Sequence, residues 1–241
     1  MSDFLSLDHV SKSYGSLKVT DDLSLALAEG EALGVIGPNG AGKTTMFNLI
    51  TGDVRPDAGN VRFDGREIAA LAPSARCRAG IGRSYQIPHP FAGMTVFENV
   101  LVGGTFGAGR SEAEAASACV EVLERTGLLA KANLLAGSLT LLDRKRLELA
   151  RALATAPRLL LLDEIAGGLT EHEVYALVET INEIRAEGVS IIWIEHIVHA
   201  LLAVVDRLVV INFGRLLTEG DPAEVMASAE VQEVYMGISV A

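Results

Sequence analysis

The stretch Gly37-Pro38-Asn39-Gly40-Ala41-Gly42-Lys43-Thr44 decides the fold of this chain. It fits G-x-x-x-x-G-K-[ST], a pattern whose glycines let backbone N–H groups converge on phosphate oxygens without a Cβ in the way. The apolar run 32–36 precedes it and predicts a buried strand, and a helix-like segment follows it. This order of strand, glycine-rich loop and helix favours a phosphate-binding P-loop over a glycine-rich turn that binds nothing.

The polar residues of the loop match the chemistry of a bound nucleotide. We expect Lys43 to reach the β and γ phosphates and the Thr44 hydroxyl to ligate Mg²⁺, with Thr45 beside it in the first helical turn. The helix that follows points its positive N-terminus at the anion. A nucleotide with β and γ phosphates and Mg²⁺ are therefore the predicted ligands of the loop. The predicted nucleotide-binding residues of the loop are Gly37, Pro38, Asn39, Gly40, Ala41, Gly42, Lys43, Thr44 and Thr45.

A second motif, Leu159-Leu160-Leu161-Leu162-Asp163-Glu164, predicts a buried strand that ends in two carboxylates. Ligands of open α/β sheets bind at the carboxyl ends of strands. We expect Asp163 to hold Mg²⁺ through water, as a Walker B aspartate does, and Glu164 to orient or deprotonate the attacking water. The motif is weak by itself, because a solvated strand end has the same pattern. The P-loop upstream makes the catalytic interpretation the favoured one.

The first two thirds of the chain change from strand patterns to helix patterns. Leucines at 23, 25 and 27 alternate as on a half-buried strand, and Asp64-Gly65 predicts a hairpin turn. The capping box at 111–114 begins a helix that Gly127 can end, and a second helix is expected over about 141–155.

The last third alternates strands and helices, which is typical of a parallel sheet with crossover helices. Asp221-Pro222 begins a final helix, with an N-cap residue and a proline at the first helical position. The elements expected before it are strands at 159–162, 191–194 and 208–211 and a helix at 171–186.

Composition excludes several classes of protein. The 241 residues include 31 acidic and 20 basic side chains, for a formal net charge of −11, which argues against nucleic acid as a main partner. Cys77 and Cys119 have no metal-binding spacing. The N-terminal stretch predicts no signal peptide, and no apolar run is long enough to span a bilayer. A mean hydropathy of +0.33 indicates either a large core or apolar surface covered by partners.

With these motifs in this order, the chain resembles the ATP-binding cassette of ABC transporters over nearly its whole length. It is most similar to the ATP-binding subunits of branched-chain amino-acid, amide and urea importers. The resemblance implies that Tyr14 stacks on adenine, that Gln86 contacts Mg²⁺ or the attacking water, and that His196 is the switch histidine. A neutral imidazole there can hydrogen-bond a γ-phosphate oxygen. The alternatives without a functional role are a surface or core tyrosine, a loop glutamine and a hydrogen-bonded histidine at a strand end.

The resemblance also implies the architecture. The fold class is α/β, a P-loop NTPase of the ABC ATPase type, with a mixed sheet core, an antiparallel β subdomain and an inserted helical subdomain. Residues 1–95 and 156–215 would form the nucleotide-binding core, 96–155 the helical subdomain with the signature helix, and 216–241 the C-terminal tail helices.

The signature region departs from the family pattern L-S-G-G-Q, which binds the γ phosphate held by the opposite subunit. The equivalent stretch is Leu139-Thr140-Leu141-Leu142-Asp143, in which Thr140 keeps the hydroxyl but leucines replace both glycines. Asp143 would place negative charge near a polyphosphate unless its side chain turns away and caps the helix. Position 165 is isoleucine where the family usually has proline, and Thr170 replaces an aspartate. Two interpretations stay open. Either this motif has only a structural role, or two cassettes form an asymmetric pair in which one ATP site is impaired.

The leading interpretation is the ATP-hydrolysing subunit of an importer for branched-chain amino acids or related small amides. Its implied partners are a second cassette in a homo- or heterodimer, transmembrane permease subunits and, indirectly, a solute-binding protein, with no nucleic acid. The implied location is peripheral, on the cytoplasmic face of the inner or cell membrane. One alternative is an ATP-binding regulatory subunit with weak hydrolysis, paired with a competent cassette. Another is a soluble ABC-type ATPase acting on DNA or ribosomes, which the acidic charge disfavours.

Overall fold

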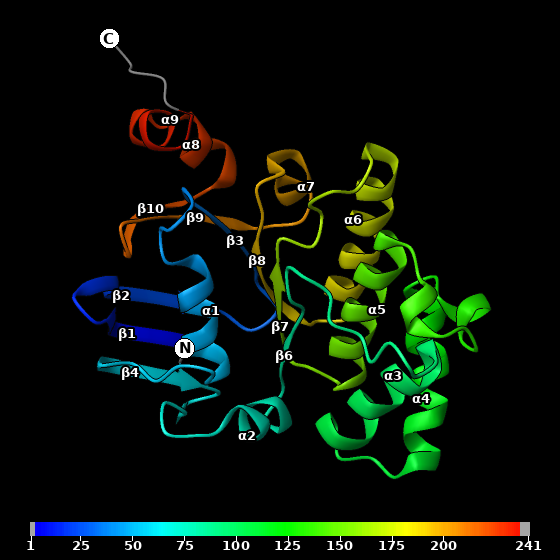
Figure 1. The fold of residues 1–241 in the computed structure, drawn as a ribbon. Helices are drawn as coiled ribbons and strands as arrows, with labels where there is room; N and C mark the ends of the chain where they lie inside the picture. The colour runs from blue at the N-terminus through cyan, green and yellow to red at the C-terminus, as the bar shows by residue number, and fades with distance from the viewer. Residues whose placement is uncertain (1–2, 237–241) are drawn as a thin grey trace. The chain divides into compact units, whose positions relative to one another are not determined.

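The P-loop extends from a strand buried on both faces. In the computed structural model, which describes residues 3–236, this strand is β3 (Ala32–Ile36), and all five of its residues are buried. It pairs in parallel with β8 (Ser190–Ile194) on one side and with β9 (Arg207–Asn212) on the other. β10 (Arg215–Gly220) pairs antiparallel with β9, so the sheet is mixed (Figure 1). Burial on both faces explains the continuous apolar runs that predicted these strands.

A second sheet, which is antiparallel, is formed by strands within residues 5–67. Its order is β2-β1-β4-β5, formed by β1 (Leu5–Tyr14), β2 (Leu17–Leu27), β4 (Ala58–Phe63) and β5 (Arg66–Glu67). The alternating leucines of β2 are buried and Ser24 between them is exposed, as predicted. The Asp64-Gly65 turn joins β4 to β5, with φ of 51° and 71° at its two residues. The antiparallel β subdomain expected from the resemblance is therefore present.

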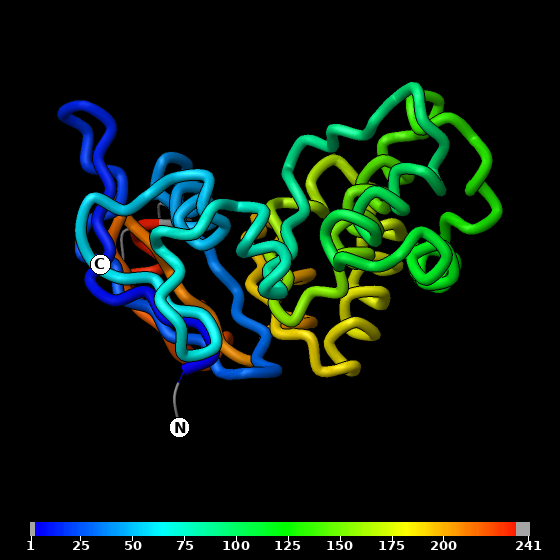
Figure 2. The backbone as a smooth tube through the Cα atoms, turned by 90° about the horizontal axis from the view of Figure 1, so that it is seen from below, coloured from blue at the N-terminus to red at the C-terminus, as the bar shows by residue number. Residues whose placement is uncertain are grey.

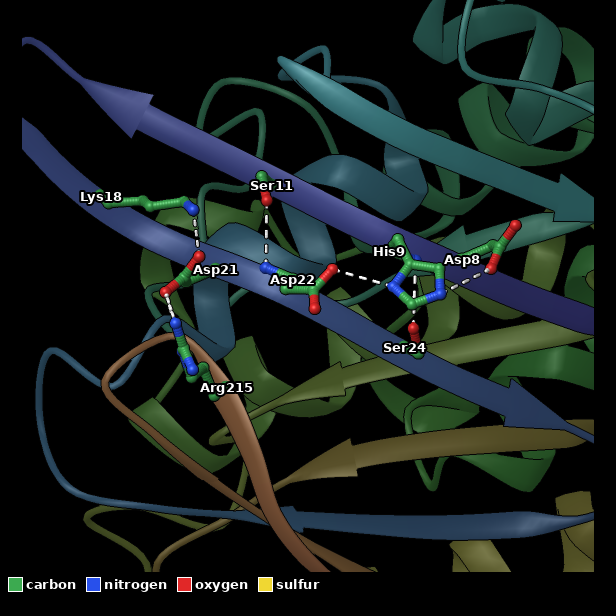
Figure 3. Close-up of polar contacts among 8 residues, drawn as sticks. All are labelled: Asp8, His9, Ser11, Lys18, Asp21, Asp22, Ser24 and Arg215. Carbon is green, nitrogen blue, oxygen red and sulfur yellow. Dashed lines mark hydrogen bonds and ion pairs between the residues drawn. The ribbon is translucent and has the colours of Figure 1, made fainter.

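The pairing register of β1 and β2 shifts at the centre of the pair, where both strands bulge. Figure 3 shows the polar contacts made by residues of this region. His9 and Asp22 have left-handed φ values of 51° and 57°. The His9 N–H donates to Ser24 Oγ and the Asp22 N–H donates to Ser11 Oγ, each at 3.0 Å, so hydroxyls of the opposite strand satisfy both bulged amides. His9 Nδ1 lies 2.8 Å from Asp22 Oδ1, and this hydrogen bond raises the pKa of the exposed His9. The turn of this hairpin, dark blue, extends from the strands in Figure 2.

A second compact unit spans residues 74–189 and contains two more strands and most of the helices. β6 (Ile81–Arg83) and β7 (Leu159–Asp163) pair in parallel, and β7 is buried throughout. Helices α3 (Val96–Val102), α4 (Glu112–Arg125) and α5 (Leu141–Ala154) contact one another, and α6 (Glu171–Ala186) follows β7. Thr95, Ser111 and Thr170 each begin a helix with a complete capping box.

The first compact unit comprises residues up to 73 and from 190 onward. Besides its sheets it contains helices α1 (Lys43–Thr51), α7 (Val198–Leu202), α8 (Pro222–Ala227) and α9 (Ala229–Met236). Asp221 caps α8 as predicted, because its side chain accepts from the N–H groups of Ala223 and Glu224. The tail helices begin only at Pro222, since residues 215–220 form β10. Residues 237–241 of the predicted tail lie outside the described residues.

Two details of the second unit were not expected from the sequence. Helix α2 (Pro73–Arg78) precedes β6, and a π-helical turn, η1 (Gly103–Gly107), follows α3. Short 3-10 turns η2 (Leu129–Lys131) and η3 (Ala136–Ser138) lead into α5. The predicted subdivision into a core and a helical subdomain at 96–155 stays a prediction. Within residues 3–236, each helix is too short or too polar to cross a bilayer.

Candidate nucleotide-binding and catalytic site

The P-loop conformation depends on its glycines. Gly37 and Gly42 have φ of 153° and 102°. A Cβ on Gly37 would overlap the Ile211 carbonyl, and one on Gly42 would lie 2.5 Å from the Val19 carbonyl oxygen. The backbones of β2 and β9 therefore approach the loop too closely for any larger residue. The Gly214 N–H also donates to the Ala41 carbonyl at 2.9 Å, which fixes the far side of the loop.

Lys43 lies within the loop that it ends. Its ammonium donates to the carbonyls of Gly37 at 2.6 Å and Pro38 at 3.1 Å, and the residue is 6% exposed. Helix α1 begins at Lys43, and its N-cap is Gly42, which has no side chain to cap the first N–H groups. A buried ammonium and a helix N-terminus converge here, which is the donor set that fits a polyphosphate. Thr44 is exposed and Thr45 is half-buried in the first turn.

Hydrogen bonds also hold the hairpin of β1 and β2 to the segment around Gly214, which contacts the P-loop. The Asp21 N–H donates to the Gly214 carbonyl at 2.9 Å, and the Asp21 carboxylate binds Lys18 and the Nε of Arg215, the latter at 2.7 Å (Figure 3). Hydrogen bonds from Lys18 and Arg215 lower the pKa of Asp21. Tyr14, at the end of β1, is 47% exposed, and the Lys12 ammonium lies over its ring, 5.8 Å from the ring centroid.

His196 follows β8 by two residues and is exposed. Because β3 and β8 run parallel with Val35 opposite Ile194, the P-loop and His196 both extend from the same edge of the sheet. The buried Glu195 carboxylate accepts the His196 N–H at 2.8 Å and so fixes the backbone where the strand ends. The first unit therefore brings Lys43 and His196 to one carboxyl edge, where ligands of α/β sheets bind.

The second unit brings Gln86, Asp163 and Glu164 together in the same way. Asp163 is the last residue of β7 and is 3% exposed, and Glu164 comes next in the chain. Gln86 follows the parallel neighbour β6 and donates its side-chain N–H to the Glu164 carboxylate. The predicted catalytic glutamate is thus already oriented by the predicted glutamine.

Arg83 is a residue of this site that the motif analysis missed. Its guanidinium binds the Asp163 carboxylate at 2.8 Å, and the two side chains are 5% and 4% exposed. No local pattern in the sequence marks it; in the structure it ends β6 and pairs with Leu161, two residues before Asp163 in β7. The Tyr85 ring covers the guanidinium at 4.6 Å. Asp163 therefore has a buried counter-ion within the second unit.

The signature region starts helix α5. Thr140 is its N-cap, and its hydroxyl oxygen accepts the Asp143 N–H at 3.3 Å. The buried Asp143 carboxylate accepts from the Thr140 hydroxyl at 2.8 Å and from Lys131 at 2.6 Å. Burial raises the pKa of Asp143, but the hydrogen bonds from Lys131 and Thr140 outweigh it and lower the pKa. The negative charge at this departure from the family pattern is thus bound within the chain.

No group of three or more His, Cys, Asp or Glu side chains among residues 3–236 could hold a metal ion alone. Mg²⁺ commonly uses one or two protein oxygens and completes its shell with substrate phosphates and water. The Thr44 hydroxyl in the first unit and the Asp163 carboxylate in the second are each oxygen donors of the kind that Mg²⁺ takes. Binding of Mg²⁺ stays an expectation from the sequence.

A strand, P-loop and helix on one sheet, with an Asp-Glu pair ending a buried parallel strand, define a P-loop nucleotide-binding ATPase. The model of the ABC transporter family matches residues 20–167, and the chain belongs to that family as an ATP-binding cassette.

The relatives span transporters of different solutes. The chain is 36% identical to the high-affinity branched-chain amino acid transport ATP-binding protein LivG of Salmonella typhimurium, over 97% of each chain. Identity is also 36%, over the same shares, to the branched-chain protein BraF of Pseudomonas aeruginosa. It is 37%, over 98% of each chain, to the lipopolysaccharide export protein LptB of Acidithiobacillus ferridurans.

Solved structures agree with the fold. A nucleotide-free ATP-binding cassette of an ABC transporter aligns with a TM-score of 0.89 and 29% identity, over 98% of this chain and 100% of the other. The ADP conformation of an ATP-binding cassette aligns with a TM-score of 0.88 and 29% identity, over 99% and 100%. This chain is accordingly the nucleotide-binding ATPase of an ABC transport complex.

Proposed function

We propose that this chain is the ATP-hydrolysing subunit of an importer for branched-chain amino acids or related small amides. The observation that carries the ATPase role is the Glu164 carboxylate, held by Gln86 next to the buried Asp163. The solute class rests on the 36% identity to LivG and BraF over nearly full length. The regulatory alternative loses support, because Glu164 is retained and the Asp143 charge is neutralised.

Each site residue has a part in hydrolysis. Tyr14 stacks on the adenine, and Lys43 with the first turn of α1 binds the phosphates. Mg²⁺, for which Thr44 and Asp163 would be protein ligands, would neutralise charge on the phosphates. Glu164 orients the attacking water and accepts its proton, Gln86 holds that carboxylate, and the His196 imidazole hydrogen-bonds a γ-phosphate oxygen. The hydroxyl of Thr140 belongs to the site of a second cassette.

The proposal also assigns partners and a location. A second cassette, identical or not, completes each ATP site, and transmembrane permease subunits receive the motion. A solute-binding protein delivers the solute to those subunits. The chain then sits peripherally on the cytoplasmic face of the membrane. The coarse statement that it belongs to a transport complex follows from its family.

The first test is Mg-ATP turnover per subunit of the purified chain against its concentration. We expect turnover to rise with concentration and to vanish in Glu164→Gln, which keeps the size of the side chain but cannot accept a proton. Nucleotide binding should survive in the variant. If wild type and variant hydrolyse equally, Glu164 is not the base. If ATP binds but turnover stays at background at every concentration, the chain needs a different partner cassette.

The solute is tested in the assembled complex. Permease subunits that co-purify with the chain are placed in liposomes, and ATP-driven accumulation of leucine, isoleucine, valine and urea is measured. Uptake of one of these supports the proposal. Outward movement of a lipid, as the name of the LptB relative describes for its own system, would replace it.

A further inference from the structure

The turn that carries Glu164 has an unusual backbone. Glu164 has a φ of 47°, in the left-handed region that a side chain with a Cβ seldom occupies. Such a residue keeps its conformation only where the surrounding structure holds it, and such residues gather at functional sites. The direction in which the Glu164 carboxylate leaves the chain depends on this φ. Something must therefore hold the backbone of the turn.

Lys145 supplies such a hold from helix α5. The residue is 7% exposed, and its ammonium donates to the carbonyl of Ile165 at 3.0 Å and approaches that of Glu164 at 3.4 Å. A buried ammonium binds carbonyl oxygens more strongly than a neutral donor does. Two successive carbonyls that share one cation must point the same way, and this fixes the peptide between them.

A second contact one helical turn earlier joins the same two segments. Leu141, four residues before Lys145 on α5, places a methyl group 3.4 Å from where a Cβ on Gly168 would lie. Residues four apart lie on one face of a helix, so this face of α5 lies along residues 164–168. Gly168 has a φ of 78°, which itself favours glycine.

We propose that Lys145 is the positioning residue of Glu164, and that it ties the catalytic turn to the helix that starts at the signature motif. The proposal rests on the role assigned to Glu164 under the proposed function. It explains why a charged side chain is buried in α5 at a place where no substrate contact is expected. It also means that a displacement of the N-terminus of α5 is transmitted to the general base.

The test compares Lys145→Met with Lys145→Arg and Arg144→Met in the full chain. Methionine keeps the length but loses the donor, and arginine keeps a donor that can reach both carbonyls. Arg144 is the matched control, since it is the next residue of α5 and also donates to a carbonyl, that of Gly137 at 2.9 Å, away from the turn. ATP affinity, the rate constant for hydrolysis and amide hydrogen exchange over residues 164–169 are measured for each.

We expect Lys145→Met to lower kcat by about ten- to a hundredfold, the cost of misplacing a catalytic group by roughly 1 Å. ATP affinity should stay at the wild-type value, and amide exchange of the turn should become faster. Lys145→Arg should restore both, and Arg144→Met should change neither. In a Glu164→Gln background, Lys145→Met should cause no further loss of hydrolysis.

Two results would overturn the proposal: wild-type kcat with wild-type exchange in Lys145→Met, or equal losses in Arg144→Met. If Lys145→Met does not fold, Lys145→Gln, too short to reach both carbonyls, takes its place with the same expected losses. The exchange measurement needs no turnover, so it decides whether Lys145 holds the turn even where the chain lacks a partner. An active Glu164→Gln variant would instead defeat the role of Glu164 while leaving the exchange result intact.

Discussion

At the scale of single residues, the ion pair between Arg83 and Asp163 lies at the end of the catalytic strand. Both side chains are almost fully buried, and their charged groups lie 2.8 Å apart. Burying a charge costs free energy unless a group of opposite charge compensates it. The Arg83 guanidinium is such a group for the Asp163 carboxylate.

Removing the Arg83 guanidinium should therefore lower the stability of the fold. We expect Arg83→Met to lower the free energy of unfolding by about 3–5 kcal/mol, because it removes one partner of a buried ion pair. Urea unfolding measures the change. Arg62→Met is the control, since its Nε lies 3.8 Å from Glu67 between exposed side chains, and such a pair contributes under about 1 kcal/mol. Equal small losses in the two variants would show that Asp163 finds compensation elsewhere.

At the scale of helices and strands, local sequence rules predicted most of the fold. The apolar runs of β3 and β7, the helix at 171–186 and the caps of α4 and α8 lie where the patterns placed them. These elements are specified by their own residues, through burial on both faces or through a capping side chain. The P-loop was predictable for the same reason, because close backbone contacts demand its glycines.

Features that depend on contacts between distant segments were not predictable. Arg83 and Asp163 are 80 positions apart, and Lys145 meets the Glu164 turn from another helix. No local pattern marks either pair. The π-helical turn η1 was not predicted for a related reason. Its glycines at 103, 104 and 107 are required by close contacts with neighbouring segments rather than by the turn itself.

Packing at η1 gives a prediction at this scale. A Cβ on Gly103 would lie 2.7 Å from the Arg151 carbonyl oxygen and 3.1 Å from the Ala154 methyl group. We expect Gly103→Ala to lower the free energy of unfolding by about 1–3 kcal/mol through overpacking, although alanine is the better helix former. Gly93→Ala is the matched control, because an added Cβ there meets nothing within 4 Å. Thermal unfolding of both variants measures the difference. A Gly103→Ala variant more stable than Gly93→Ala would contradict this account.

At the scale of the whole molecule, the net charge of −11 acts on assembly. If two copies close on ATP, as the proposed function has it, like charges must approach each other. Repulsion between exposed charges weakens as salt shortens the screening length, from about 30 Å at 0.01 M to about 8 Å at 0.15 M. A partner cassette of different composition need not carry this penalty.

Association of the Glu164→Gln variant with itself should therefore be tighter at higher salt. This variant is the form to use, because blocked hydrolysis lets the ATP-bound pair persist. We expect sedimentation velocity to show a dimer that forms only with Mg-ATP and that is lost in Lys43→Ala. Its dissociation constant should fall from 0.01 to 0.15 M NaCl, because the screening length falls below about 10 Å over this range. An ATP-dependent dimer that weakens with salt would mean that complementary charges, rather than screened repulsion, dominate the interface. A monomer at every salt concentration would point to a second, different cassette as the natural partner, because ATP binding alone would then not bring two copies of this acidic chain together.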